Sequence, residues 1–267
     1  MSQDSVLETV HQAGVEVPKG SQGVFDLPCG YLDPEGVLHR EVQVREITGY
    51  EEDMMSSKSV PDYKKGGLLI AGCLQRVGTI TDPRIIAEIP SKLLVGDRTF
   101  LVFAIRRATY GDSYPFRDEC PKCSYNGIFS LDLGELEIKT APDPTKRLFE
   151  LDLPSGLKVK FHPLTGAEEE TLFKSRGKEE AISLSMLARL DVMGDKAPTL
   201  RDVQGLVGRD RAALREAFDA VEGGINTSLE MQCPSCSEEF DRELDVAQAG
   251  FFSPSQVLKD SKKKSST

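Results

Sequence analysis

The chain of 267 residues has no tryptophan and only three histidines, and aromatic residues make up 7% of it. Its few Tyr and Phe residues are not interleaved with basic residues, as they are in proteins that stack single-stranded nucleic acids. No apolar run approaches the roughly 20 residues that a membrane-spanning helix needs. The opening stretch, MSQDSVLETVHQAG, lacks the basic flank and apolar core of a secretory signal. These absences predict a protein that is made in a cytoplasm and does not enter a membrane.

Positive charge is also scarce. The sequence has 33 Lys and Arg against 43 Asp and Glu, which gives a net charge of -10. Because nonspecific affinity for nucleic acid arises largely from Lys and Arg, this balance disfavours nucleic acid as a partner. The one basic cluster, Lys259 with 262–264, falls in the C-terminal stretch SPSQVLKDSKKKSST, which is typical of a solvated flexible tail.

The motifs of common active sites are missing as well. The sequence has no glycine-rich phosphate loop, no Gly-x-Ser-x-Gly turn and no His-Glu-x-x-His helix. The histidines His11, His39 and His162 are scattered, and His162 is expected roughly opposite Glu46 in the repeat described below. We therefore predict no catalytic residue, no small-molecule substrate and no enzyme activity.

Four of the six cysteines form two Cys-x-x-Cys turns, Cys120 with Cys123 and Cys233 with Cys236. Reduced thiols at this spacing indicate a metal site rather than disulfides. Each turn supplies two of the four thiolates that tetrahedral zinc takes, and four protein ligands leave no open position, so the sequence predicts one structural zinc. Another metal or cluster, or a redox pair like that of thioredoxin, are the alternatives. The two turns are separated by 109 residues, so such a site must be split across the chain.

An internal repeat explains the split. The segment DRTFLVFAIRRATYGDSYPFRDECPKC begins at Asp97, and DRAALREAFDAVEGGINTSLEMQCPSC begins at Asp210. Both run 23 residues from the Asp to the first Cys, so the offset between them is 113. We expect residues 97–133 and 210–246 to form the same unit, a helix followed by a hairpin with the Cys-x-x-Cys turn at its tip.

Two earlier blocks also match. FDLPCG at 25–30 resembles LDLPSG at 151–156, and this places Cys29 opposite a serine, so a metal role for Cys29 or for the unpaired Cys73 is not expected. Both are predicted to be small buried residues. Insertions separate the blocks, because the offset is 126 at their prolines and 113 at the cysteines. The stretch YLDPEGVLHR is one such insertion and predicts a hairpin extension.

A strand followed by Thr-Gly and acidic residues also occurs twice. Thr48 with Glu51, and Thr165 with Glu168, have the spacing of a capping box at the start of a helix. The acidic runs could instead hold a cation or act in catalysis, but capping explains their spacing completely. Later in each copy, the pairs Leu101/Ile105 and Leu214/Phe218 sit four residues apart and predict one buried helix face.

The predicted fold class is therefore α+β, an internally duplicated unit of strand hairpin plus helices whose two copies are joined by a split four-cysteine zinc ribbon. The expected divisions are a flexible N-terminus at 1–20, copy one at 21–133 ending in the first zinc knuckle, a linker at 134–147, copy two at 148–252 ending in the second knuckle, and a flexible basic tail at 253–267.

Together these motifs resemble a known family. Leu-Pro-x-Gly, a strand running into REITGYEED, then VGDR before a long helix, and the Cys-x-x-Cys knuckles are similar to the T-even-type baseplate hub proteins of contractile-tailed bacteriophages. The strand-Thr-Gly-acidic segments also resemble the short tail-assembly chaperones of such phages. The resemblance covers most of residues 23–250.

The resemblance implies a non-enzymatic structural or assembly role in the tail baseplate hub. The implied partners are other phage tail or baseplate proteins. The implied location is the host cytoplasm during assembly, and two alternatives stay open afterwards: the protein remains in the virion tail baseplate, or it acts only during assembly. Two other classes stay open: a zinc-ribbon protein that binds nucleic acid or regulates transcription, which needs a basic face around the metal, and a metal-stabilised enzyme, which needs a pocket with converging titratable groups.

Overall fold

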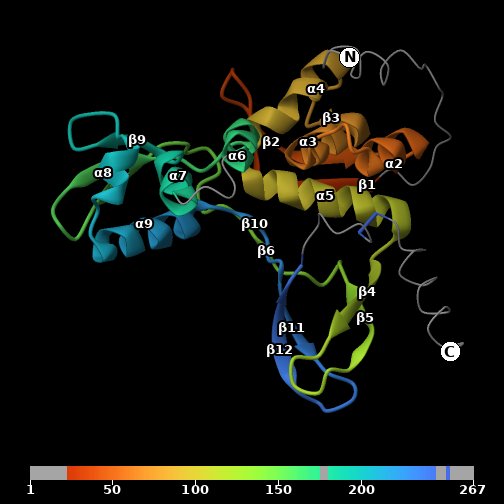
Figure 1. Ribbon diagram of the computed structural model, residues 1–267. Helices are drawn as coiled ribbons and strands as arrows, with labels where there is room; N and C mark the ends of the chain where they lie inside the picture. Colours follow the sequence, from red (N-terminus) through yellow and green to blue (C-terminus); the bar gives the residue numbers. More distant parts are fainter. Residues whose placement is uncertain (1–22, 175–179, 245–250, 253–267) are drawn as a thin grey trace, which may run out of the picture.

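A computed structural model describes residues 23–174, 180–244 and 251–252 (Figure 1). The expected flexible ends, 1–20 and 253–267, lie outside these residues. The fold is α+β, as predicted: small antiparallel sheets are accompanied by helices, and two hairpins extend away from the helical part. None of the described helices has both the length and the apolar character that crossing a bilayer requires.

The first unit is built on a three-stranded antiparallel sheet in the order β1-β2-β3, with two helices between β2 and β3 and two more after β3. The elements are β1 (Gly23–Leu32), β2 (Leu38–Val44), α2 (Gly49–Ser56), α3 (Asp62–Cys73), β3 (Leu74–Val77), α4 (Pro83–Lys92) and α5 (Val95–Tyr110). The expected hairpin extension is confirmed, because Leu32 pairs with Leu38 across the turn of Asp-Pro-Glu-Gly.

The second unit contains a sheet of the same order, β7-β8-β9, with helices at the same places in the chain. Its elements are β7 (Phe149–Asp152), β8 (Lys158–Phe161), α6 (Gly166–Phe173), α7 (Ala181–Leu187), β9 (Leu190–Met193), α8 (Leu200–Gln204) and α9 (Gly208–Val221). In both units the chain leaves the third strand through a turn closed by a short bridge, Val77 with Ile80 and Met193 with Lys196.

A two-stranded hairpin follows the last helix of each unit. These hairpins are formed by β4 (Ser113–Glu119) with β5 (Asn126–Asp132), and by β11 (Ser228–Gln232) with β12 (Glu239–Glu243). The expected linker at 134–147 also contains a strand, β6 (Ile138–Lys139), which pairs with β10 (Gly224–Ile225) just after α9. This pairing joins the linker to the base of the second hairpin.

Each unit has its own apolar core. In the first, α5 is buried against the β1-β2-β3 sheet and the neighbouring helices; Leu101 and Ile105 are fully buried. In the second, Leu214 and Phe218 of α9 pack with strand residues such as Val159 and Phe161. The predicted buried face of each long helix is therefore confirmed. Burying this apolar area is the main term that stabilises either unit.

Both predicted capping boxes are present, at the starts of α2 and α6. The Thr48 N–H donates to Glu51 Oε2 at 2.7 Å, and the Thr165 N–H donates to Glu168 Oε2 at 2.8 Å. These bonds satisfy backbone donors that have no partner inside the helix. The helix starts thus explain Glu51 and Glu168, whereas Glu169 and Glu170 are ion-paired with Arg98 on α5.

A buried aspartate near the start of each long helix bonds the Leu-Pro-x-Gly segment of its unit. Asp97 Oδ1 accepts from the Cys29 N–H at 2.7 Å, and Asp210 Oδ1 accepts from the Ser155 N–H at 3.0 Å. Both carboxylates are almost fully buried. Cys29 and Cys73 are buried as predicted, and burial is the main reason that the pKa of each thiol is raised to about 12.

Candidate metal centre

The two Cys-x-x-Cys turns cap the tips of the two hairpins and have the same local geometry. In the first, the Cys120 N–H donates to the Tyr125 carbonyl at 2.9 Å and the Ser124 N–H donates back to Cys120 at 3.0 Å. In the second, the same bonds join Cys233 with Glu238 and with Ser237, at 2.8 and 2.9 Å. A serine with positive φ closes each turn, Ser124 at 55° and Ser237 at 57°. This conformation aims both thiols of a turn to one side.

The turns bring all four cysteines together, although they come from distant parts of the chain. Their sulfur atoms lie within 4.8 Å of one another. Cys120 Sγ is 3.7 Å from Cys236 Sγ, and Cys123 Sγ is 3.6 Å from Cys233 Sγ. A disulfide would need about 2.05 Å. In a tetrahedral site with zinc–sulfur bonds of about 2.3 Å, two sulfurs are about 3.8 Å apart.

The four cysteines differ in how far they are buried. Cys120 and Cys233 are buried, Cys236 is half-buried and Cys123 is exposed. Burial pushes the pKa of Cys120 upward, but the backbone N–H groups of Cys123 and Lys122 and the neighbouring thiols outweigh it and lower the pKa to about 7. A thiol with this pKa loses its proton readily, which is the form that binds metals. In the same cluster the Glu238 backbone N–H lowers the pKa of Cys236, but the Cys123, Cys233 and Cys120 thiols and burial outweigh it and raise the pKa to about 12. The four cysteines can hold a metal ion because of their geometry, since their sulfurs lie within 4.8 Å of one another.

Contacts other than sulfur also join the hairpins, which lie side by side in Figure 1. Arg242 on β12 reaches Asp118 on β4 through its Nε at 2.6 Å, and its Nη2 donates to the Glu119 carbonyl at 2.9 Å. The rings of Phe129 and Phe240 meet edge to face with centroids 6.2 Å apart. The hairpins are thus aligned by polar and aromatic contacts besides the cysteines.

The surroundings of the cysteines are not basic. Lys122 is the one basic residue inside either turn, and its ammonium is ion-paired with Glu238. Glu119 and Glu239 lie next to the turns on β4 and β12. This charge distribution does not fit a surface that grips phosphates.

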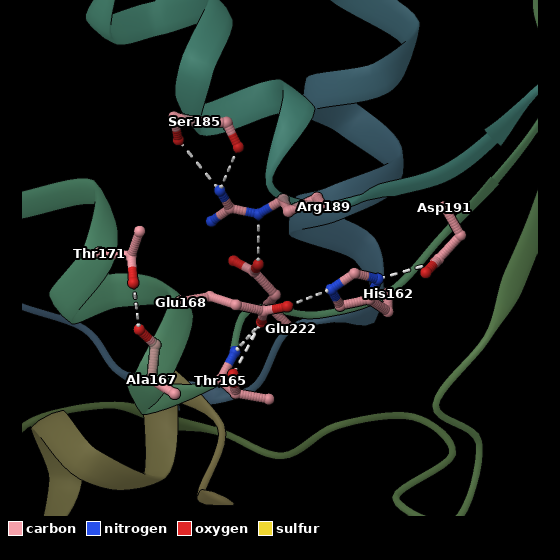
Figure 2. Close-up of polar contacts among 9 residues, drawn as sticks. All are labelled: His162, Thr165, Ala167, Glu168, Thr171, Ser185, Arg189, Asp191 and Glu222. Atoms are coloured by element: carbon pink, nitrogen blue, oxygen red, sulfur yellow. Dashed lines mark hydrogen bonds and ion pairs between the residues drawn. The ribbon is translucent and has the colours of Figure 1, made fainter. Parts of the chain in front are cut away.

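A second polar cluster lies in the second unit, around His162 at the end of β8 (Figure 2). The His162 Nε2 is 2.9 Å from Glu168 and its Nδ1 is 2.7 Å from Asp191. The pKa of His162 is raised to about 9, mainly by the hydrogen bond to Glu168. Burial lowers this pKa, but the bond to Asp191 raises it further, and the two carboxylates outweigh burial. Burial alone would raise the pKa of Glu168, but His162 and the N–H and hydroxyl groups of Thr165 lower it to about 2.

This cluster does not have the properties of an active site. His162 is charged at neutral pH with both ring nitrogens engaged, so it cannot accept a proton as a general base. Arg189 nearby is likewise engaged, with Glu222 at 2.9 Å and with Ser185 (Figure 2). His39 contacts Asp33, and His11 lies outside the described residues. The arrangement is that of an ion-pair network that supports the fold.

The position of His162 corrects the sequence alignment. His162 was expected opposite Glu46, but it stands where the first unit has Arg45: the Arg45 guanidinium contacts Glu51 at 2.8 Å, as His162 contacts Glu168. Both basic residues precede the capping glutamate by six positions. This shared spacing could have been recognised in the sequence. Aligning Thr48 with Thr165 without a gap places His162 opposite Arg45.

Comparison with families of known proteins gives a match. A family model described as "T4 bacteriophage base plate protein" matches residues 39–190, which is more than half of the chain. The matched region runs from β2 to the start of β9 and includes the first Cys-x-x-Cys turn but not the second. Neither the curated proteins nor the solved structures give a match.

Proposed function

Because this chain belongs to the T4 bacteriophage base plate protein family, we propose that it is a non-enzymatic structural or assembly component of the baseplate hub of a contractile phage tail. The family match over residues 39–190 is the observation that carries the proposal. The polar clusters support it, since their side chains are engaged with one another rather than directed at a substrate.

The partners that follow from this role are other phage tail or baseplate proteins. The chain would meet them in the host cytoplasm during assembly and would stay with them in the virion tail. Its net charge of -10 supports protein partners over nucleic acid.

We further propose that Cys120, Cys123, Cys233 and Cys236 bind one structural zinc between the hairpins. The sulfur separations of 3.6 and 3.7 Å support this, because they match the edge of a zinc–thiolate tetrahedron. Four thiolates would fill the coordination sphere and leave no position for a substrate, so the ion would stabilise the fold rather than act in catalysis.

The two units are proposed to be copies of one ancestral unit, at 21–133 and 148–252. Several features support this: sheets of the same strand order, a capping box after the second strand, a buried aspartate on the long helix, and a hairpin with matching turn geometry. The zinc would then join the ends of the two copies. This arrangement explains why one site is split across the chain.

A zinc-ribbon protein that binds nucleic acid or acts as a regulator is the alternative. It needs exposed basic side chains around the metal. The engagement of Lys122 with Glu238, and the glutamates on either side, speak against it.

The proposed function is tested by assembly of the phage tail. Negative-stain images of assembly products would be compared for three sources: phage lacking this protein, phage complemented with the native chain, and phage complemented with Cys233→Ser. We expect complete baseplates with the native chain alone. Complete baseplates in phage that lack the protein would overturn the proposal. Complete baseplates in phage complemented with Cys233→Ser would show that the baseplate role does not require the zinc.

A further inference from the structure

A groove lies on the second unit between α6, α7 and α9, with a volume of about 550 Å³. We call it the second-unit groove. Apolar side chains form much of its lining, among them Leu172, Met186 and Phe218, and Ile182 at its edge is 65% exposed. Pockets that bind ligands typically have volumes of about 300–1,000 Å³. The groove is thus large enough to take side chains from another molecule.

Two charged side chains on α9, Arg215 and Asp219, line the same groove one helical turn apart. Both are exposed, and within the described part of the chain neither the guanidinium nor the carboxylate has a hydrogen-bond or ion-pair partner. A guanidinium donates hydrogen bonds and a carboxylate accepts them. Together they are complementary to the C=O and N–H groups of a peptide main chain.

The corresponding place on the first unit is filled by the chain itself. Phe251 packs on α5, with its ring centroid 5.1 Å from that of Phe103, and its carbonyl accepts from Arg106 Nε at 3.2 Å. The Phe252 carbonyl accepts from the Tyr110 hydroxyl at 3.0 Å, and that hydroxyl also reaches Glu52 on α2 at 3.3 Å. Both phenylalanines are buried. An adjacent aromatic pair thus covers one face of α5 beside α2.

The two places share two positions, although Phe103, on which the Phe251 ring packs, stands opposite Glu216, which is not part of the groove lining. With the offset of 113 on the long helices, Asp219 stands opposite Arg106 and Arg215 opposite Val102. With the offset of 117 set by the capping threonines, Glu169 stands opposite Glu52. Glu169 lines the second-unit groove, as Glu52 borders the Phe251–Phe252 pair.

Exposure differs sharply between these counterparts. On α5, Arg106 is 0% and Val102 is 8% exposed, whereas Asp219 and Arg215 on α9 are both exposed. At the neighbouring position Phe218 replaces Ile105, and both are buried. In the second unit these two positions of the long helix are therefore uncovered.

We propose that the second-unit groove binds a peptide segment of a partner protein that carries two adjacent large apolar side chains, in the manner in which α5 holds Phe251 and Phe252. The proposal rests on the duplication put forward above. The apolar side chains would fill the space over Leu172 and Phe218, while Arg215 and Asp219 would bind the main chain of the segment. The occupant is a peptide rather than a small molecule, because the groove shares positions with a place that the first unit covers with a segment of its own chain; that it comes from a protein of the same assembly follows from the proposed function.

The test uses the full chain and a fluorescent peptide with the sequence of residues 249–255, Ala-Gly-Phe-Phe-Ser-Pro-Ser. We expect saturable binding to one site by fluorescence polarisation, and no binding of the peptide in which both phenylalanines are alanine. Ile182→Asp should weaken binding at least about tenfold, because it places a charge at the apolar edge of the groove. Ile85→Asp is the matched control: Ile85 is 47% exposed on α4, outside the groove, and its replacement should leave the Kd unchanged.

A chain with Phe251→Ala and Phe252→Ala separates the proposal from the duplication. It should gain a second peptide site if the two places are equivalent. If the native chain binds one peptide and the double variant also binds only one, the two places are not equivalent. That result would overturn the equivalence on which the proposal rests.

Absence of saturable binding to the native chain, or equal binding by Ile182→Asp, would overturn the groove as a docking site. Dimers of the native chain that form with increasing concentration and are lost in Ile182→Asp would overturn the choice of partner, because the occupant would then be a second copy. The sedimentation coefficient distinguishes that case.

Discussion

At the scale of single residues, the basic residue that precedes each capping box differs between the units, and this difference makes the stability of the second unit depend on pH. Arg45 carries a permanent charge opposite Glu51, whereas His162 can lose its charge opposite Glu168. Because the pKa of His162 is raised to about 9 in the folded chain, its stabilising effect is complete below the unfolded value of about 6.5 and is lost as the pH rises through 9.

We therefore expect His162→Arg, which restores the residue found in the first unit, to flatten this pH dependence. The native chain should lose on the order of 2 kcal/mol of unfolding free energy between about pH 6.5 and pH 9.5 through this residue, after its partial exposure is allowed for. Urea unfolding at both pH values measures the loss, and Arg45→Lys serves as a control that keeps a charge in the first unit. The same loss in His162→Arg and in the native chain would contradict the assignment.

The cysteines permit a second prediction at this scale. Cys233→Ser should remove the bound metal and lower the unfolding free energy by on the order of 3 kcal/mol or more, because a structural zinc contributes its binding energy to folding. Cys29→Ser should leave the metal content unchanged, since Cys29 stands opposite Ser155 and is not one of the four clustered cysteines. Equal metal content in the native chain and Cys233→Ser would rule out the role of Cys233.

At the scale of elements, the two capping boxes should contribute similarly to their units. Thr48→Ala and Thr165→Ala each remove the threonine hydroxyl of the capping box of an eight-residue helix, which donates to Glu51 or Glu168, so each should cost about 1 kcal/mol. Urea unfolding monitored by circular dichroism measures both. A loss confined to one variant would show that the helix starts are not equivalent, and Thr171→Ala, inside α6, is the control for a threonine that caps nothing.

The sequence predicted the elements best where local chemistry repeats at a fixed spacing. The capping boxes, the buried faces of α5 and α9 and the hairpin tips were all predicted from such spacings. The pairing of β6 with β10 was not, because a two-residue strand inside a proline-containing linker has no periodic signal. The docking of Phe251 and Phe252 on α5 was missed as well: it joins residues about 145 positions apart and depends on tertiary packing alone.

The same reasoning explains which part of the candidate site could be predicted. The four cysteines were identified by a spacing that occurs twice, and the structure brings their sulfurs within 4.8 Å. The contacts that align the hairpins, such as Arg242 with Asp118, have no counterpart in the repeat and no motif of their own. They depend on how two surfaces meet, which a single sequence does not encode locally.

At the scale of the whole molecule, charge argues against nucleic acid as a partner. A chain that ends at Phe252 lacks the basic tail and should bind duplex DNA weakly at physiological salt. Fluorescence polarisation with a labelled duplex at several salt concentrations measures this, and the full chain shows what the tail adds. Tight binding that falls steeply with salt would favour the zinc-ribbon alternative.

The central claim for the whole molecule is that one zinc ion joins the ends of the two units. Metal analysis of reduced chain purified without chelator, combined with X-ray absorption at the zinc edge, tests it most directly. We expect one zinc per chain with four sulfur ligands at about 2.3 Å. Near-zero zinc, two ions per chain, or a shell with nitrogen or oxygen ligands would contradict a single site shared by Cys120, Cys123, Cys233 and Cys236.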